Sequence, residues 1–125
     1  MSIAIGLTGR ATLRVTEADT AVTLRSGDVP VLATPRLLGL CEEACVQAIR
    51  GELAPGLTTV GMRVQFDHLA PTGIGSSVTA EATLEKVEGR RLTFTAAASD
   101  PGGFVGAGKL TRVVVEVAPF LKKAH

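Results

Sequence analysis

The segment "RLLGLCEEACVQAIR" (36–50) constrains the fold more than any other part of the chain. Thr34-Pro35 just before it is a helix start signal, because Thr can cap exposed N–H groups and Pro suits the first helical position. Gly51 just after it is a helix stop signal. The segment is apolar around most of a helix circumference, and a helix of this kind is usually wrapped by a sheet rather than laid on a surface. The sequence therefore predicts one long central helix enclosed by strands.

Strand patterns and turn signals make up most of the remaining sequence. Strands are expected at 57–69, 76–87, 91–99 and 104–117, and two short strands at 11–25 around Glu17-Ala18-Asp19. Glu88-Gly89 predicts a tight hairpin. The glycines of the last strand indicate a bulge or a close approach of another backbone. Since there is no linker, repeat or low-complexity tract, we expect a single α+β domain over residues 1–125.

Composition excludes several classes of protein. The apolar fraction is 46%, but there are only four Phe and no Trp or Tyr, and the net charge is near +1. This balance argues against nucleic-acid binding, which favours basic surfaces and stacking aromatics. The chain opens with no secretory signal, and no apolar run approaches the length of a membrane span. We therefore expect a cytoplasmic protein with no nucleic-acid or membrane partner.

The two cysteines do not predict a metal site. Cys41 and Cys45 lie four residues apart in the expected helix, without a second Cys pair and with one internal His. Zinc sites usually take four Cys or His ligands. We expect both thiols to be reduced, buried core side chains.

Two adjacent glutamates fall on different faces of the helix. Glu43 shares its stripe with polar residues, whereas Glu42 shares its stripe with Leu38, Cys45 and Ile49. An acid among apolar neighbours carries a desolvation cost unless it is paired or protonated. Glu42 is therefore either bound to a buried Arg or to backbone, or it has a chemical role.

An alternating run ends in the one internal histidine. In "VGMRVQFDH" the apolar side chains take the even positions, which predicts a core-facing set of Val60, Met62, Val64 and Phe66. His68 continues this set. Taken alone, His68 could be a rim histidine and Thr34 a simple helix cap. Together with Glu42, they could form an acid–base site beside a helix N-terminus that stabilises an oxyanion.

At these residues the chain resembles a known family. The stretches "VLATPRLLGLCEEACVQAI" (31–49) and "VGMRVQFDHLAPTGIGSSVTAEATLEKVEGRRLTF" (60–94) are similar to the hotdog-fold thioesterases related to fluoroacetyl-CoA thioesterase. The distinctive elements are Ala-Thr followed eight residues later by Glu, the strand ending in His, and "VEGRRL". The resemblance runs from about Val31 to Phe120. It implies a hotdog fold, in which an antiparallel sheet wraps around one helix, and a homodimer with active sites at the subunit interface.

The resemblance also implies an activity, which is hydrolysis of a short or medium acyl-CoA thioester to free acid and CoA. By position, the catalytic residues of the family fall on Thr34, Glu42 and His68. A glycine that binds the substrate carbonyl through its backbone falls on Gly61, and an arginine near the acyl pocket falls on Arg112. Read from the pattern alone, Arg112 could equally be a surface strand residue.

The chemistry expected of these residues needs no metal or organic cofactor. His68 would deprotonate the Thr34 hydroxyl or a water molecule, with Glu42 orienting it or acting as the base. An acyl-Thr intermediate and direct water attack both remain open. The CoA phosphates require cations, and the candidates, each of which could also be an ordinary solvated side chain, are Arg90, Arg91, Lys86 and Lys109.

One segment departs from the family pattern. The fluoroacetyl-specific members resemble each other in having phenylalanines in a lid before the catalytic Thr, whereas "LRSGDVPVLAT" (24–34) has no aromatic residue. Fluoroacetyl selectivity therefore does not follow. The alternative function is a non-catalytic acyl-ligand binder. A hotdog hydratase is disfavoured, because its Asp and His lie several residues apart, whereas Asp67 and His68 are adjacent and face opposite ways.

Overall fold

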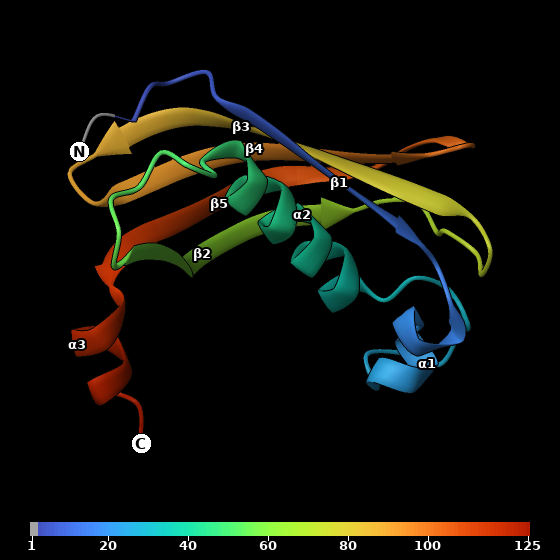
Figure 1. Ribbon diagram of the computed structural model, residues 1–125. Coiled ribbons are helices and arrows are strands. Elements are labelled where there is room, and N and C mark those ends of the chain that lie inside the picture. Colours follow the sequence, from blue (N-terminus) through green and yellow to red (C-terminus); the bar gives the residue numbers. More distant parts are fainter. Residues whose placement is uncertain (1–2) are drawn as a thin grey trace.

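The computed structural model describes residues 3–125, in which helix α2 (Thr34–Ala48) lies against the concave face of one antiparallel sheet (Figure 1). The sheet has five strands in the order β1-β3-β4-β5-β2. Their bounds are β1 Thr8–Arg14, β2 Leu57–His68, β3 Ser77–Glu88, β4 Arg91–Asp100 and β5 Gly103–Glu116. This is the α+β hotdog arrangement that the sequence predicts, with an antiparallel sheet wrapped around a central helix.

The core lies between α2 and the sheet. The helix buries one broad face, which consists of Leu37, Leu40, Cys41, Ala44, Cys45 and Ala48. A Cβ atom at Gly9 would overlap the backbone of Ala44 and Ala48, so glycine allows β1 to cross the helix at close range. Cys41 and Cys45 are free and buried, as expected, and burial raises the pKa of the two thiols to about 11 and about 12.

The segment 11–25 was predicted wrongly in part. After β1 the chain forms a 3-10 turn (Glu17–Asp19) and a short helix, α1 (Ala21–Leu24), instead of a second strand. Side-chain caps explain the difference, since the Asp19 carboxylate accepts hydrogen bonds from the Thr16 backbone N–H and hydroxyl. Thr20 then caps α1 by accepting from the Thr23 N–H. Such local bonds favour turns over an extended chain.

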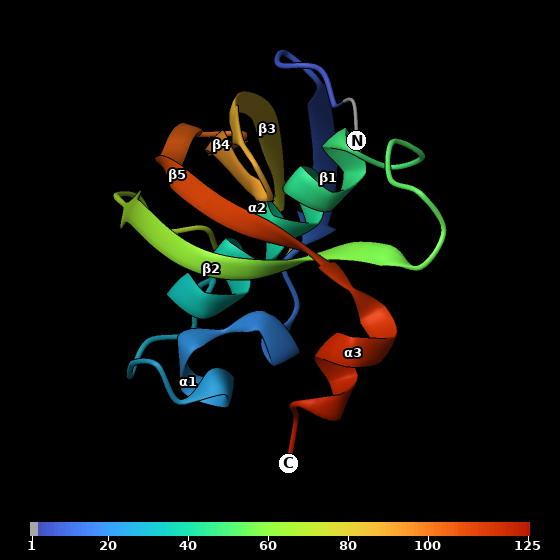
Figure 2. The ribbon, with the colours of Figure 1, turned by 90° about the vertical axis from the view of Figure 1, so that its left-hand side faces the viewer.

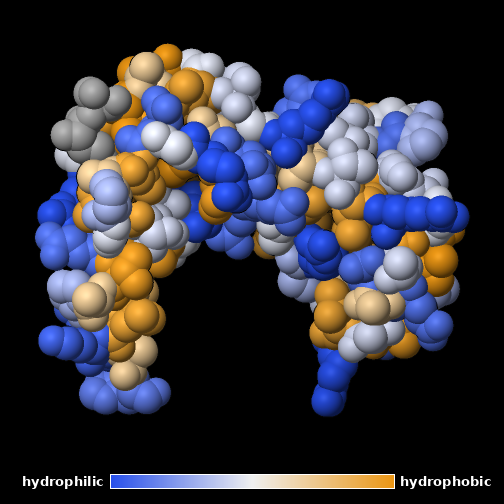
Figure 3. Space-filling model, viewed as in Figure 1, coloured by the Kyte–Doolittle hydropathy of each residue, from blue (hydrophilic) through white to orange (hydrophobic). Residues whose placement is uncertain are grey.

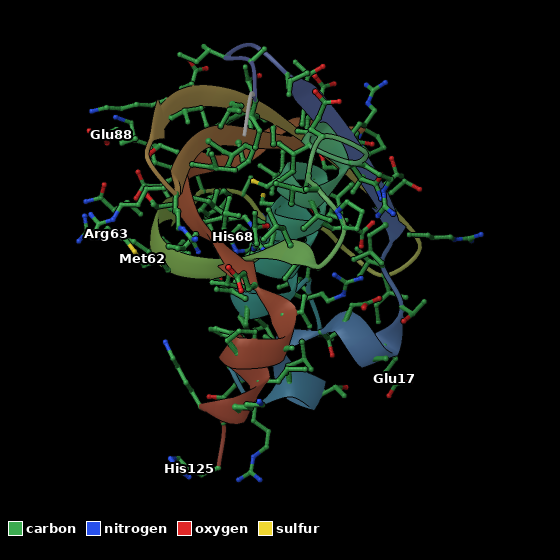
Figure 4. All side chains as sticks on the ribbon, turned by 60° about the vertical axis from the view of Figure 1, so that its left-hand side comes forward. Glu17, Met62, Arg63, His68, Glu88 and His125 are labelled. Carbon is green, nitrogen blue, oxygen red and sulfur yellow. The ribbon has the colours of Figure 1, made fainter. Side chains whose placement is uncertain are left out.

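The prediction for β2 was right for one half of the strand and wrong for the other. Opposite the regular strand β5, the register of β2 shifts between Gly61 and Arg63 because Met62 forms a β-bulge. Thr59 and Gly61 therefore lie on the face toward α2 before the bulge, and the even-numbered set from Val64 to His68 lies on that face afterwards, although Val64 itself is 43% exposed and is not a core residue. Val60 and Met62 do not belong to the inward face, and Met62 is exposed. Figure 4 shows Met62 and Arg63 projecting outward, while His68 lies within the body of the molecule.

The other turns and glycines agree closely with expectation. The β3–β4 hairpin turns at Gly89-Arg90, one residue later than predicted, because Glu88 still pairs with Arg91. A Cβ atom at Gly106 or Gly108 would overlap the backbone of β2, so these glycines allow the close approach. The register of β5 also shifts against β4 between Ala98 and Ser99. The last strand thus has both features that its glycines indicate.

Two short helices project from opposite ends of the sheet on the same side. Helix α1 lies near the end of β2, and helix α3 (Val117–Lys122) follows β5 near the start of β2 (Figures 1 and 2). The space-filling view shows a wide gap between these two projections (Figure 3). No helix within residues 3–125 is long and apolar enough to cross a membrane.

Candidate active site

The N-terminus of α2 and the C-terminus of β2 bring Thr34 and His68 together. Thr34 Oγ1 and His68 Nδ1 share a hydrogen bond of 2.8 Å, although the two residues are 34 positions apart. The sequence predicted Thr34 as the helix cap, but Thr34 is the first helical residue. The N-cap is Ala33, and no side chain caps the helix. The Thr34 hydroxyl is therefore free of the capping role and is directed at the imidazole.

His68 has one hydrogen-bonded nitrogen and one without a partner. Among residues 3–125, Nε2 is buried and has no hydrogen-bond partner. The bond to Thr34 is therefore the one that orients the ring. A ring with Nδ1 unprotonated can accept the Thr34 proton, which is the arrangement a general base needs. Buried polar atoms left without partners are uncommon in proteins and are often found where chemistry takes place.

The Thr34–His68 pair lies in the wall of an open cleft of about 330 Å³. The remaining wall comes from the loop after α1 and from the residues that follow β2, including Val29, Val31 and Leu69. These side chains are apolar. A cleft that combines apolar side chains with a Thr–His pair suits a small ligand with an acyl chain and one reactive carbonyl.

Asp19 and Arg36 hold the start of α2 in place. The Arg36 guanidinium forms an ion pair of 3.2 Å with Asp19, and the Ala33 N–H donates to the Asp19 carbonyl. Burial tends to raise the pKa of Asp19, but the hydrogen bonds from Thr16 and the positive charge of Arg36 outweigh burial and lower it. The carboxylate is thus kept ionised beside the helix start that carries Thr34.

A second polar cluster lies further along α2. The Arg112 guanidinium donates from Nη1 to Glu42 Oε2 at 2.8 Å, from Nε to the Thr59 hydroxyl and from Nη2 to the Thr59 carbonyl. Arg112 is buried, so it is not a surface strand residue. Glu42 is bound to a buried Arg, one of the two roles considered for it. Glu43 is exposed, as predicted.

Gly61 lies opposite Glu42. A Cβ atom at Gly61 would come within 2.6 Å of Glu42 Oε2, so any larger residue there would push the carboxylate out of its present position. Gly61 also pairs with Arg112 across the β2–β5 ladder. The structure thus brings together three of the residues singled out from the sequence, Gly61, Glu42 and Arg112, around one point on the inner face of β2.

The two clusters are separate within one chain. Glu42 follows Thr34 by eight residues, which corresponds to about 12 Å along a helix. The hydrogen bond that Glu42 makes within residues 3–125 is to Arg112 and not to His68. The expected orientation of His68 by Glu42 is therefore not present in the single chain.

The candidate CoA-binding cations are not gathered in one place, since Lys109 pairs with Gln65 in the second half of β2 and the other three lie at or near the β3–β4 hairpin. Arg90 and Arg91 are exposed at the β3–β4 hairpin, where Arg91 is level with Val113 and therefore with the first half of β2. His68 lies at the other end of that strand. Lys86 forms an ion pair with Glu88. Within residues 3–125, no group of three or more His, Cys, Asp or Glu could hold a metal ion.

Sequence reasoning missed two parts of the site. Thr59 anchors Arg112, and the signal for it was its position two residues before Gly61 on the same strand face. The apolar cleft wall from Val29 and Leu69 was also missed, because loop residues far apart in the sequence form it. No pattern within either loop indicates this contact.

Comparisons with known proteins agree with the geometry. A model of the fluoroacetyl-CoA-specific thioesterase family matches residues 15–118. A fluoroacetyl-CoA thioesterase from Streptantibioticus cattleyicolor is 39% identical over 95 residues, which cover 76% of this chain and 68% of that protein.

Solved structures extend the likeness over nearly the whole chain. A solved structure of a fluoroacetyl-CoA thioesterase is similar with a TM-score of 0.92 and 31% identity, covering 98% of this chain and 96% of the other. A hot-dog-like protein from Thermanaerovibrio acidaminovorans is similar with a TM-score of 0.85 and 33% identity, covering 95% and 87%. The chain therefore belongs to the fluoroacetyl-CoA-specific thioesterase family.

Proposed function

We propose that this protein hydrolyses short or medium acyl-CoA thioesters to the free acid and CoA, as a cytoplasmic homodimer. The observation that carries the proposal is the 2.8 Å hydrogen bond between Thr34 Oγ1 and His68 Nδ1 in the wall of a partly apolar cleft. A hydroxyl bonded to a neutral imidazole is the arrangement that nucleophilic acyl transfer requires. Family membership supports the same reaction class, because a relative is named a fluoroacetyl-CoA thioesterase.

In the proposed reaction, His68 Nδ1 takes the Thr34 proton as Thr34 Oγ1 attacks the thioester carbonyl carbon. The uncapped N-terminus of α2 lies at the same place, and its free N–H groups stabilise the developing oxyanion. The C–S bond then breaks, and the CoA thiolate takes the proton from His68. A water molecule, deprotonated by His68, hydrolyses the acyl-Thr ester and restores the hydroxyl.

Glu42 takes part in this scheme from the second subunit. It is about 12 Å along the helix from Thr34 in its own chain, too far for both to act on one carbonyl. β2 is an edge strand, and two copies of an edge strand can extend the sheet by antiparallel pairing. In such a dimer the start of one β2 lies beside the end of the other. Glu42 and Gly61 of one chain thereby approach His68 of its partner.

The same arrangement gives roles to the other predicted residues. Glu42 Oε2 is bound to Arg112, and the side chain remains 39% exposed, so Oε1 can orient the water that attacks the acyl-Thr ester. The backbone of Gly61 contacts the substrate carbonyl, and Arg112 lies beside the acyl group. Arg90 and Arg91 are exposed cations for the phosphates of CoA.

The test is release of free thiol from a panel of acyl-CoAs of two to ten carbons, with gel filtration to determine the oligomeric state. We expect thiol release that is proportional to enzyme concentration, and a dimer. Measurable binding of these acyl-CoAs without thiol release from any of them would instead favour the acyl-ligand binder.

A further inference from the structure

We infer that α3 of one subunit closes the acyl cleft of the other, with Phe120 providing the aromatic cover that residues 24–34 lack. This inference rests on the homodimer of the proposed function and adds a residue that determines specificity. Its occupant is a second copy of this chain, and its ligand is a short acyl group.

Helix α3 has an apolar side that its own chain leaves largely uncovered. Val117, Phe120 and Leu121 are exposed, with Phe120 at 38%. The Val117 N–H donates to the Gly56 carbonyl, so the start of α3 is fixed to the residue that precedes β2. Beyond this point α3 projects away from the sheet, and apolar surface lines the side of this projection that faces the gap (Figures 1 and 3).

A second uncovered apolar surface lies at the other end of β2, around the cleft. Val29 is 55% exposed and Leu69 is 68% exposed, and both line the cleft beside Thr34 and His68. Ile74, Val22 and Leu24 are exposed nearby in the sequence. Exposed apolar residues gathered in this way mark surfaces that a partner or ligand covers. Within one chain the length of β2 separates this surface from α3.

Symmetry brings the two surfaces together. Identical strands that pair antiparallel in one continuous sheet are related by a two-fold axis perpendicular to the sheet, so both α2 helices remain on the same side. The axis exchanges the ends of β2. The Leu57 end of one chain, to which α3 is fixed, then lies beside the His68 end of its partner. The gap in Figure 3 receives the partner, and each α3 reaches the partner's cleft.

The chemical consequence is a cleft closed by apolar side chains from two subunits. Ser26 and Gly27, which lie in the cleft wall, cannot exclude water from an acyl-enzyme ester. A phenylalanine and a leucine that arrive from the partner's α3 can. Removing them should weaken binding and reaction of short acyl groups, which have few other apolar contacts.

Proximity is tested without any assay of activity. Chains carrying Val29→Cys and chains carrying Phe120→Cys are co-expressed with different tags and treated with a short bismaleimide. Cys41 and Cys45 are buried and their thiol pKa values are raised, so they contribute little background. Phe104→Cys in place of Phe120→Cys is the matched control, because Phe104 is also exposed, at 54%, but lies beside Thr79 and Glu81 on the outer face of the sheet.

We expect a crosslinked dimer for the Val29–Phe120 pair and much less for the Val29–Phe104 pair. Equal yields, or no crosslinked dimer in either mixture, would overturn the inference. This result stands whether or not the protein hydrolyses thioesters, so it separates failure of the inference from failure of the proposed function.

Specificity is tested with Phe120→Ala, with Phe104→Ala as the control. We expect kcat/KM for acetyl-CoA to fall by about tenfold or more in Phe120→Ala, since apolar contacts with a small substrate typically account for 10–200-fold. Phe104→Ala should match the wild type. Equal kcat/KM in Phe120→Ala and the wild type would contradict the inference while leaving the proposed hydrolysis intact.

Hybrid dimers show which chain provides the cover. In a hybrid of Thr34→Ala chains with Phe120→Ala chains, the one intact Thr34 meets an intact Phe120 only if α3 acts across the interface. We expect this hybrid to have half the wild-type kcat and the wild-type KM. In the reverse pair, a Thr34→Ala/Phe120→Ala double variant with the wild type, kcat/KM should fall. The opposite pattern would mean that α3 covers its own chain.

Discussion

Both polar clusters of this molecule draw on α2 and β2, and the second adds Arg112 of β5, yet they differ in how completely their hydrogen bonds are satisfied. Arg112 makes three hydrogen bonds, to Glu42 and to two atoms of Thr59, and is buried. The Thr34–His68 pair makes one, and within residues 3–125 the second ring nitrogen of His68 has no partner.

The difference distinguishes a cluster in which Arg112 fixes the position of Glu42 from a pair that can react directly. A buried network whose members are all bonded rigidifies its surroundings. A hydroxyl bonded only to an imidazole at the wall of an open cleft has a proton to give and a substrate-sized space beside it. Proteins tend to leave hydrogen-bonding groups without partners where function requires it. The predictions below test this division.

The largest effect is expected at the reactive pair. His68→Ala should reduce thiol release by roughly a thousandfold, because a positioned general base contributes about 10²–10⁴-fold. Circular dichroism and gel filtration should show an unchanged fold and assembly, since the ring makes a single hydrogen bond. A folded variant with an undiminished rate would make His68 an ordinary rim histidine.

The next effect separates the two adjacent glutamates. Glu42→Gln should lower kcat by about 100- to 1,000-fold, because an amide lacks the negative charge with which the carboxylate holds and polarises the attacking water, and the loss of one fixed electrostatic contact typically costs this much. Glu43→Gln, on the exposed face, should change kcat little. The measurement is kcat for acetyl-CoA in both variants. Equal losses would show that the two helix faces do not have the different roles assigned to them.

A smaller effect concerns fluorine. Fluorine is close to hydrogen in size, and contacts as small as this difference are typically worth about 10–200-fold. The loop 24–34 provides no aromatic residue, and the proposed cover by Phe120 of the partner subunit would contact both acyl groups alike, so kcat/KM for fluoroacetyl-CoA over acetyl-CoA should not exceed that range. A ratio above about ten thousand, far outside it, would mean that strong selectivity arises without an aromatic lid in this loop.

The smallest effect concerns the support beneath Thr34. The pKa of Asp19 is lowered in the folded chain, so its contribution to stability is present above its ordinary pKa of about 3.9 and is lost as the pH falls through the folded value. Asp19→Asn should therefore lower Tm by a few degrees at neutral pH and by much less near pH 2. Asp28→Asn, in an exposed loop, is the control. A difference in Tm that does not change with pH would contradict this reasoning.

Most of the fold could be predicted because its signals are local or periodic. The apolar helix, the four later strands and the β3–β4 hairpin follow from hydrophobic periodicity, turn residues and glycine positions. The prediction for residues 16–24 was wrong because side-chain caps decide their conformation. Such caps can override a strand-like sequence pattern, and the pattern itself does not reveal them. Thr16 and Thr20 are common strand residues, and nothing local shows that their hydroxyls bond to neighbouring residues.

The site could be predicted in its members but only partly in its connections. The sequence analysis expected His68 to act on Thr34 or on water, and in the structure the two side chains share a hydrogen bond. The partner of Glu42 is 70 residues away on β5, and periodicity places Arg112 only on a face, which does not identify what it contacts. The bulge at Met62 has no sequence signal, so the inward positions before it were assigned to the wrong face.

The bulge at Met62 changes which positions of β2 point inward. Before Met62 the odd-numbered residues point toward α2, and after it the even-numbered residues do. The first half presents Gly61 to Glu42, and the second presents His68 to Thr34. A deletion or insertion of one residue at this point would leave the side chains of one half pointing toward α2 and turn those of the other half outward. The single extra residue in β2 therefore allows one strand to serve both clusters.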